Sequence, residues 1–319
     1  MKPVNRTKTE LWKSDIQQSV DFFNQWFLNH APVAFRETRI ATTENVQHAF
    51  EVTQHLNRWD AAVLLDHPEI LPTLRMVTCP PLARDRHVGL AGSEAGKLVK
   101  KLEGDNPLIK RKATCLSEHA AIILGVIKRL IDHDIFPWLN EKRDCTPEES
   151  YRAATIVADR LCSAVANPII RNSQEKRQLE TIKDWLEKRE YRFITSQEIS
   201  GIDNMPEKSF AFRYNLPAGS SDHLVNIPID VVVMRKKNKR TRYPLLIEAK
   251  SAGDFANVNK RRKEEAQKIT QLRATYGDEI QFILFLCGYF DSGYLGYEAA
   301  EGIDWVWEHR LSDLEQFGL

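Results

Sequence analysis

Apolar residues recur at helical spacing through the first 190 residues of the chain. Between residues 11 and 30, Ile16, Val20 and Phe23 are followed by Phe27, which predicts one face of an amphipathic helix. Similar spacing predicts further helices over 44–65, 93–103, 115–133, 146–166 and 173–189. We therefore expect this part of the chain to be almost wholly helical.

The stretch from Asp66 to Gly92 interrupts this pattern. It contains prolines at positions 68, 72, 80 and 81 and no sustained apolar period. A loop longer than about 15 residues in a compact domain usually has a function or is disordered. Residues 71–79 are too apolar for disorder, so we expect a long structured loop or a set of short elements.

The character of the sequence changes after residue 190. Three runs rich in β-branched and apolar residues predict buried strands, at 225–234, 243–250 and 281–287. A charged helix is expected over 257–276. A Gly/Tyr loop should follow over 289–297, and a closing helix within 301–317.

This order of elements predicts an α/β (α+β) fold, with a mixed central β-sheet flanked by helices. We expect a large helical N-terminal portion over residues 1–145 and an α/β core over residues 146–319. The length of 319 residues suffices for either one large domain or two modest ones.

Composition narrows the possible functions only moderately. Five widely spaced cysteines without a Cys-x-x-Cys pair disfavour a zinc site or a disulfide framework, and the nine histidines lack metal-ligand spacing. No apolar run approaches the roughly 20 residues of a membrane helix, and the N-terminus is polar, so we expect a cytoplasmic protein with no membrane partner. The net charge of +1 neither supports nor excludes binding to nucleic acid.

Chemistry is most clearly indicated by Asp230, Glu248 and Lys250. Asp230 lies inside an apolar strand, where a lone carboxylate is costly unless it is paired or binds a metal. Glu248 and Lys250 are two positions apart in the next strand, so they share a face. An antiparallel hairpin centred on Lys239 would place Asp230 opposite Glu248, with Cβ atoms roughly 5 Å apart. A divalent cation would relieve the repulsion between the two carboxylates.

This pattern resembles the Asp…Glu-x-Lys arrangement of the PD-(D/E)xK nuclease superfamily. Here the acid stands in Pro228-Ile229-Asp230, and the second half is Glu248-Ala249-Lys250. The alternative is a structural carboxylate pair with a solvated lysine. Glu-x-Lys alone is common by chance, but both halves in adjacent apolar strands, followed by a basic helix, favour the nuclease. The resemblance implies a Mg²⁺ ion held by Asp230 and Glu248.

Glu175 is a further catalytic candidate, near the start of the helix that precedes the sheet. In nucleases of this superfamily such a helix often brings an acid beside the metal. The alternative is a solvent-facing acid stabilised by the helix dipole. Both interpretations stay open.

Clusters of basic residues provide candidate DNA contacts. Six Lys or Arg residues lie within 235–242 without an acid, and another cluster spans 260–263. Such patches suit phosphate contacts, although solvated charged surfaces are also common. Arginines within 80–89 could read guanine or form an ion-pair network with Asp85. The candidate contacts are Arg75, Arg84, Arg86, Lys239, Lys260, Arg261, Arg262 and Lys263.

Longer motifs resemble the XamI family of type II restriction endonucleases over about residues 10–290. They lie at 12–15 with 19–23, 34–39, 74–76 with 80–86, 156–162 and 172–179. The resemblance implies a PD-(D/E)xK restriction-endonuclease-like core. It also implies Mg²⁺-dependent hydrolysis of double-stranded DNA at a short palindrome, GTCGAC, leaving 5′-phosphate and 3′-hydroxyl ends.

A palindromic target has two equivalent half-sites, so we expect a homodimer, with a cognate DNA methyltransferase as genetic partner. The helical portion would then serve DNA recognition and dimerisation. Two alternatives remain: a repair or structure-selective nuclease of the same superfamily, and a non-catalytic DNA-binding protein. Degenerate members usually lose one of the three site residues, and this chain keeps all three.

Overall fold

The computed structural model describes residues 3–104, 114–220, 223–236, 242–258 and 262–319. The chain forms two compact units. The sheet unit comprises Met1–His30 and Arg171–Leu319, and the helical unit comprises Ala31–Ile170. The predicted boundary at residue 145 differs from this division. The chain passes from one unit to the other within two long helices, α1 (Thr9–Val52) and α8 (Pro147–Glu187), so each of these helices belongs partly to both units.

Helices α1 and α8 each replace two shorter elements that the pattern predicts. In α8, Val157 and Leu161 pack in the core of the helical unit, whereas Ile182 and Leu186 pack in the core of the sheet unit. The apolar period lapses where the helix leaves one core and enters the other. A lapse in periodicity therefore marks a change of packing partner here, not the end of a helix.

The helical unit is built from short helices around the ends of α1 and α8. They are α2 (Ala61–Asp66), η1 (Pro68–Ile70), α3 (Leu71–Met76), α4 (Arg84–Ala91), α5 (Ser93–Leu102), α6 (Thr114–Arg129) and α7 (Pro137–Glu141). The region from Asp66 to Gly92 is thus a set of short elements and not a long structured loop, which were the two expectations from the sequence. The arginine-bearing segment is helical from Arg84 onward, so its description as a loop is wrong there.

The sheet unit contains one six-stranded mixed sheet in the order β1-β2-β3-β4-β5-β6. Its strands are β1 (Arg192–Phe193), β2 (Ser209–Ser220), β3 (His223–Met234), β4 (Leu245–Ala252), β5 (Gln281–Gly288) and β6 (Asp304–Trp307). Strands β2, β3 and β4 pair antiparallel, while β4, β5 and β6 pair parallel. The α/β fold with a mixed sheet is confirmed.

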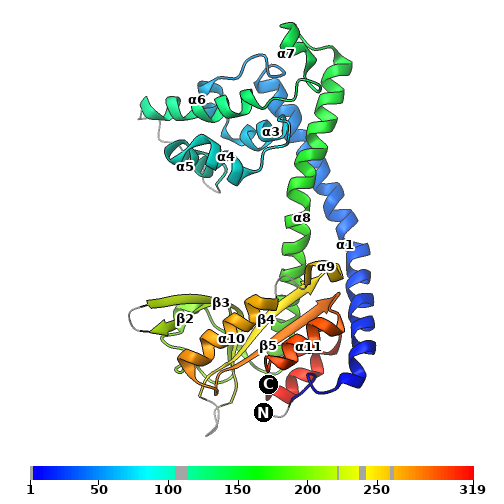
Figure 1. Cartoon of the computed structure of the whole chain (residues 1–319), viewed down its shortest axis with the longest axis vertical. Coiled ribbons are helices and arrows are strands. Elements are labelled where there is room, and N and C mark those ends of the chain that lie inside the picture. Colours follow the sequence, from blue (N-terminus) through cyan, green and yellow to red (C-terminus); the bar gives the residue numbers. More distant parts are fainter. Residues whose placement is uncertain (1–2, 105–113, 221–222, 237–241, 259–261) are drawn as a thin grey trace. The chain divides into compact units, whose positions relative to one another are not determined.

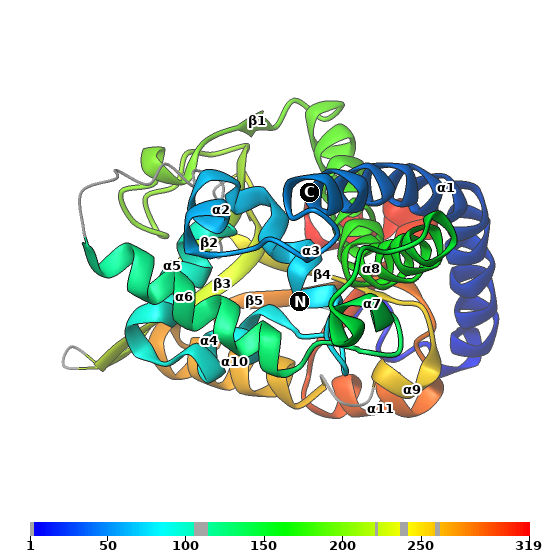
Figure 2. The same cartoon turned by 90° about the horizontal axis from the view of Figure 1, so that it is seen from above.

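Helices cover both faces of this sheet (Figures 1 and 2). On one face, α10 (Arg262–Tyr276) and α11 (Ser292–Ala300) pack through Leu272 and Leu295. On the other face lie the C-terminal part of α8 and the closing 3-10 segment η3 (Glu308–Phe317), packed through Ile182 and Leu314. The two faces of the sheet are therefore packed against different helices, each with its own apolar core.

Several elements of the sheet unit differ from expectation. The Gly/Tyr stretch over 289–297 contains most of α11, and the closing segment contains β6 followed by η3. A short helix α9 (Phe255–Val258) precedes α10. At the N-terminus, the backbone N–H groups of Val4 and Asn5 donate to the carboxylate of Asp304, at 2.6 and 2.9 Å. These bonds tie the first residues to β6 and account for their place in the sheet unit.

Helix α8 includes an 18-residue window apolar enough to cross a membrane by length and composition, with a mean hydropathy of 1.3. One third of that window is buried within the protein. Core helices of soluble proteins meet the same criterion. The window therefore supplies only weak support for a membrane span.

Candidate active site

Strands β3 and β4 bring Asp230 next to the Glu248–Lys250 segment. The described pairs between them are Val231–Ile247, Val232–Leu246 and Val233–Leu245. These pairs have the register predicted for a hairpin centred on residue 239, so that prediction is confirmed; the turn residues 237–241 lie outside the described part. One step beyond the last pair, the Asp230 Oδ2 atom accepts a hydrogen bond from the Ala249 N–H at 2.8 Å.

The alternation of β4 selects the face on which the charged residues stand. Leu246 belongs to the core on the α10 side, whereas Ile247 and Ala249 belong to the core on the α8 side. Because successive side chains of a strand point to opposite faces, Glu248 and Lys250 face α10. The shared face of the Glu-x-Lys pair therefore agrees with prediction.

Helix α10 contributes two further charged residues to this cluster. The Lys250 Nζ atom lies 3.3 Å from Glu248 Oε1 and 2.7 Å from Glu265 Oε1. The Lys268 Nζ atom lies 2.6 Å from Glu248 Oε1 and donates to the carbonyl of Pro228 at 3.2 Å. Glu265 is fully buried, and Glu248 is 5% exposed. The site thus joins acids and lysines in a largely dry environment.

The electrostatics separate the roles of Asp230 and Lys250. Burial, followed by the charge of Glu248, raises the pKa of Asp230 to about 6, against the opposing hydrogen bond from Ala249. Burial alone would lower the pKa of Lys250, but Glu248 and Glu265 outweigh it and raise that pKa above its ordinary value. Lys250 is therefore held as an ammonium, which suits stabilising negative charge and not accepting a proton.

The two carboxylates fit a hard divalent cation. Glu248 Oε2 is buried and has no hydrogen-bond partner within the described ranges. An unpartnered buried carboxylate oxygen is costly, and a Mg²⁺ ion takes oxygen ligands of this kind. The raised pKa of Asp230 also reflects a concentration of negative charge that a cation would relieve.

The backbone is irregular where Asp230 stands. The β2–β3 ladder pairs Phe212 with Val231 and Tyr214 with Ile229, and the pairs described between them skip Arg213 and Asp230. Arg213 has φ +51°, a left-handed conformation that costs a non-glycine residue about 1–3 kcal/mol. Asp230 therefore departs from the regular pairing of its strand at the point where it meets β4.

Glu175 has a described partner of its own on strand β2. Its Oε1 atom pairs with Arg213 Nη2 at 2.9 Å, and no hydrogen bond or ion pair given for the described residues joins it to the three site residues. Gln178 of α8 does reach the sheet: its amide lies 3.4 Å from the Lys250 carbonyl of β4 and 3.5 Å from the Phe285 carbonyl of β5. A catalytic role for Glu175 stays a prediction.

Sequence reasoning missed Glu265 and Lys268. Both share a helical face with Ile269 and Leu272, which are buried against the sheet. Glu265 precedes Ile269 by four positions and Leu272 by seven, so it lies on the buried face of the amphipathic helix. This spacing was the available signal, but the many other charges of α10 obscured it.

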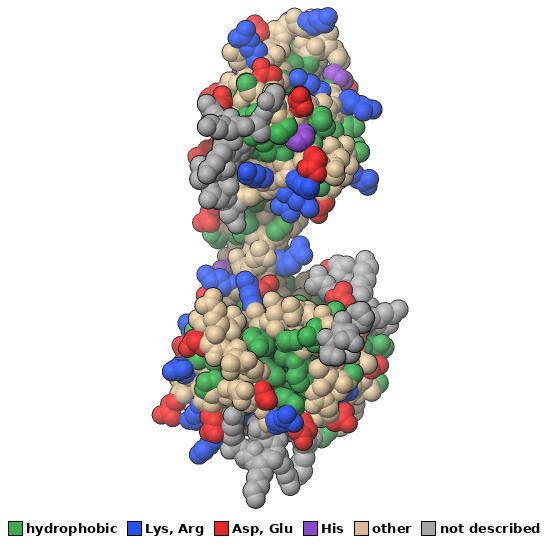
Figure 3. Space-filling view, turned by 90° about the vertical axis from the view of Figure 1, so that its left-hand side faces the viewer, with side chains coloured by type: hydrophobic (Ala, Val, Ile, Leu, Met, Phe, Trp, Pro, Cys, Tyr) green, Lys and Arg blue, Asp and Glu red, His purple; other side chains and the backbone are tan. Residues whose placement is uncertain are grey.

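The candidate DNA contacts fall into three groups. Lys239, Lys260 and Arg261 lie outside the described residues, as do the side chains of Arg262 and Lys263. Arg84 and Arg86 are exposed on α4, and Arg84 makes a 3.8 Å ion pair with Asp85. Figure 3 shows Lys and Arg side chains scattered among Asp and Glu side chains on the visible face of each unit.

Arg75 has structural partners. Its guanidinium donates to both carboxylate oxygens of Glu103, at 2.7 and 3.0 Å, and to the Leu82 carbonyl at 2.7 Å. The two side chains are only 11% and 7% exposed. The structure thus places Arg75 inside the helical unit, where it fastens the segment before α4 to the end of α5.

We expect Arg75→Met to lower the free energy of unfolding by about 3–5 kcal/mol, because it leaves the buried Glu103 carboxylate without its partner. Urea denaturation would measure the change. Arg84→Met, at a side chain 53% exposed, is the matched control and should stay within about 0.5 kcal/mol of the parent protein. Equal stability of the two variants would contradict a structural role for Arg75.

The family model described as XamI restriction endonuclease matches residues 54–307. The chain is 48% identical over 323 residues to the type II restriction enzyme SalI of Streptomyces albus G, covering 99% of each chain.

Among solved structures, protein VC1899 from Vibrio cholerae aligns over 86% of this chain at 11% identity, with a TM-score of 0.28. This chain spans 55% of the length of that protein.

Proposed function

The chain belongs to the XamI restriction endonuclease family and is a type II site-specific endonuclease, and we propose that Asp230, Glu248 and Lys250 form its catalytic centre. The observation that carries this proposal is the convergence of the buried Glu248 carboxylate, the half-buried Asp230 carboxylate and the half-buried Lys250 ammonium from adjacent strands. Perturbed ionisable groups gathered in one place are typical of active sites.

In this proposal Asp230 and Glu248 hold a Mg²⁺ ion through their carboxylate oxygens. The ion would activate water and neutralise charge on the scissile phosphate. The support from this chain is the pair of hard oxygen donors, including the buried Glu248 Oε2 atom without a hydrogen-bond partner in the described part.

Lys250 contributes a fixed positive charge. Its ammonium, held by Glu265 at 2.7 Å, orients the attacking water and stabilises charge on the phosphate oxygens. Lys268 provides a second ammonium beside Glu248. The products are 5′-phosphate and 3′-hydroxyl ends, and the target implied by the family resemblance is GTCGAC.

Partners follow from the same proposal. The substrate is double-stranded DNA, and a homodimer matches the twofold symmetry of a palindrome. The helical unit contributes to DNA grip and dimerisation, with Arg84 and Arg86 on α4 as exposed candidates for DNA contact. A cognate methyltransferase protects the host, and the enzyme acts in the cytoplasm.

Digestion of a sequenced plasmid containing one GTCGAC site tests the function. We expect one linear product with Mg²⁺ and no cleavage with EDTA, and sequencing of the ends would locate the cut. A plasmid with that site altered by one base pair is the control. Cleavage confined to nicked or branched DNA would indicate a repair nuclease. Absence of Mg²⁺-stimulated cleavage on any DNA would indicate a non-catalytic DNA-binding protein.

A further inference from the structure

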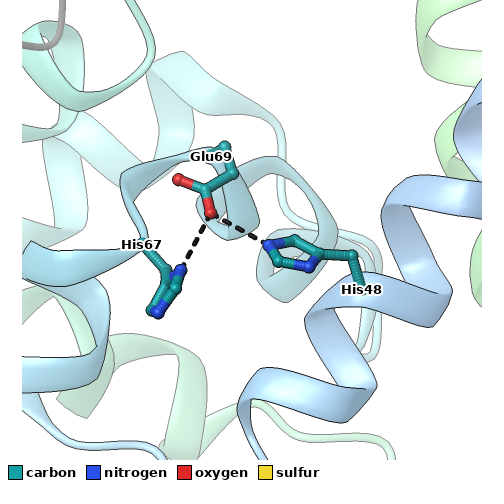
Figure 4. A group of neighbouring side chains, drawn as sticks. All are labelled: His48, His67 and Glu69. Atoms are coloured by element: carbon teal, nitrogen blue, oxygen red, sulfur yellow. Dashed lines mark hydrogen bonds and ion pairs between the residues drawn. The ribbon is translucent and has the colours of Figure 1, made fainter.

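A second group of potential metal ligands lies in the helical unit. His48 comes from α1, His67 from the turn between α2 and η1, and Glu69 from η1. Figure 4 shows the three side chains directed toward one another, with Glu69 between the two imidazoles. The Glu69 Oε1 atom lies 3.0 Å from His48 Nε2 and 3.1 Å from His67 Nδ1.

The spacing of these donor atoms is close to that of a tetrahedral metal site. With metal–nitrogen and metal–oxygen bonds of about 2.1 Å, two ligands of a tetrahedral ion lie about 3.4 Å apart. All three donor atoms here lie within 4.8 Å of one another. The side chains are 41–53% exposed, so small rotations about their side-chain bonds can complete the geometry.

The chemistry of the donors favours a different ion from that of the nuclease centre. Two imidazole nitrogens with one carboxylate oxygen are typical of zinc bound by three protein ligands, with water in the fourth position. Mg²⁺ prefers oxygen donors alone.

We propose that His48, His67 and Glu69 bind one zinc-class transition metal ion, which fastens α1 to the α2–η1 segment of the helical unit. The three ligands come from sequence positions 19 and 2 residues apart, and Asp230 and Glu248 belong to the sheet unit. This site is therefore separate from the nuclease centre and does not depend on its assignment. The competing account is a carboxylate that accepts hydrogen bonds from two imidazoles and binds no metal.

Isothermal titration of the full-length, metal-stripped protein with zinc chloride tests the proposal. Excess Mg²⁺ in the buffer occupies the nuclease centre. We expect one zinc ion per chain, and this binding should be lost in His48→Gln and in His67→Gln. The matched control is His133→Gln, because His133 is another exposed histidine of the helical unit and lies outside the cluster.

Two further readouts separate a built site from surface binding. Cobalt(II) at this site should give the visible absorption of a tetrahedral ion, which His133→Gln keeps and His67→Gln loses. Zinc should raise the melting temperature of the parent protein but not that of His48→Gln, since a ligand that binds only the folded state stabilises it. Equal zinc stoichiometry in the parent and in the His48→Gln/His67→Gln double variant would overturn the proposal. So would the absence of zinc binding to the parent protein.

Discussion

Glu248→Gln is expected to reduce DNA cleavage by about 10³-fold or more, because loss of one anionic ligand removes several kcal/mol of charge stabilisation at the metal. The amide is almost the same size as the carboxylate, so the fold should change little. It cannot balance the ammonium groups of Lys250 and Lys268, which lie 3.3 and 2.6 Å from the carboxylate. Single-turnover cleavage of plasmid DNA with saturating Mg²⁺ would measure the loss.

DNA binding distinguishes a catalytic effect from unfolding. In Ca²⁺, the Glu248→Gln variant should still retard a duplex containing the target in a gel-shift assay, since Glu248 is not among the proposed DNA contacts. Glu264→Gln is the control, because Glu264 is an exposed acid on α10 next to the buried Glu265. A Glu248→Gln protein that cuts DNA as fast as Glu264→Gln would refute the assignment of Glu248 to the metal site.

Lys250→Met is expected to have two effects at once. Loss of the ammonium should slow cleavage by about 10²–10³-fold, the usual effect of removing one preorganised group that stabilises charge in the transition state. It should also cost about 3–5 kcal/mol of stability, because the fully buried Glu265 loses the partner that lies 2.7 Å away. Single-turnover kinetics and urea denaturation measure the two effects separately.

A double variant separates these effects. Lys250→Met/Glu265→Gln removes the unpaired buried charge, so stability should recover toward that of the parent while cleavage stays slow. Lys176→Met, at an exposed lysine of α8, should leave both quantities close to those of the parent. Recovery of cleavage together with stability would show that Lys250 acts through the fold and not on the phosphate.

The local geometry of the proposed catalytic residues was predictable from sequence. Strand β3 and strand β4 are neighbours in the chain, and a hairpin has few possible registers once its centre is known. The alternation of side chains along a strand then sets which residues share a face. For these reasons the sequence is sufficient to bring Asp230, Glu248 and Lys250 together on neighbouring strands.

Other elements escaped prediction for identifiable reasons. Strand β2 contains Arg213, Asn215, Pro217 and Gly219, which break the expected apolar pattern. Strand β6 is only four residues long, and it lies buried beside β5 because the chain returns to the sheet after α11. Helices α1 and α8 each contribute apolar residues to two separate cores. The apolar pattern is interrupted between the two contributions, so the sequence predicted two shorter helices in place of each long one.

From the sequence alone come the three central strands, the register of the β3–β4 hairpin and the helical character of the first 190 residues. These features depend on neighbours close in the chain. The packing of distant elements is what brings Glu265 and Lys268 to strand β4, places Arg75 on Glu103 and gathers His48 with His67 and Glu69. Such contacts depend on how elements distant in sequence pack against one another. The hydrophobic effect that drives this packing is non-directional. The apolar pattern therefore predicts which residues are buried, but it does not predict which distant residues come into contact.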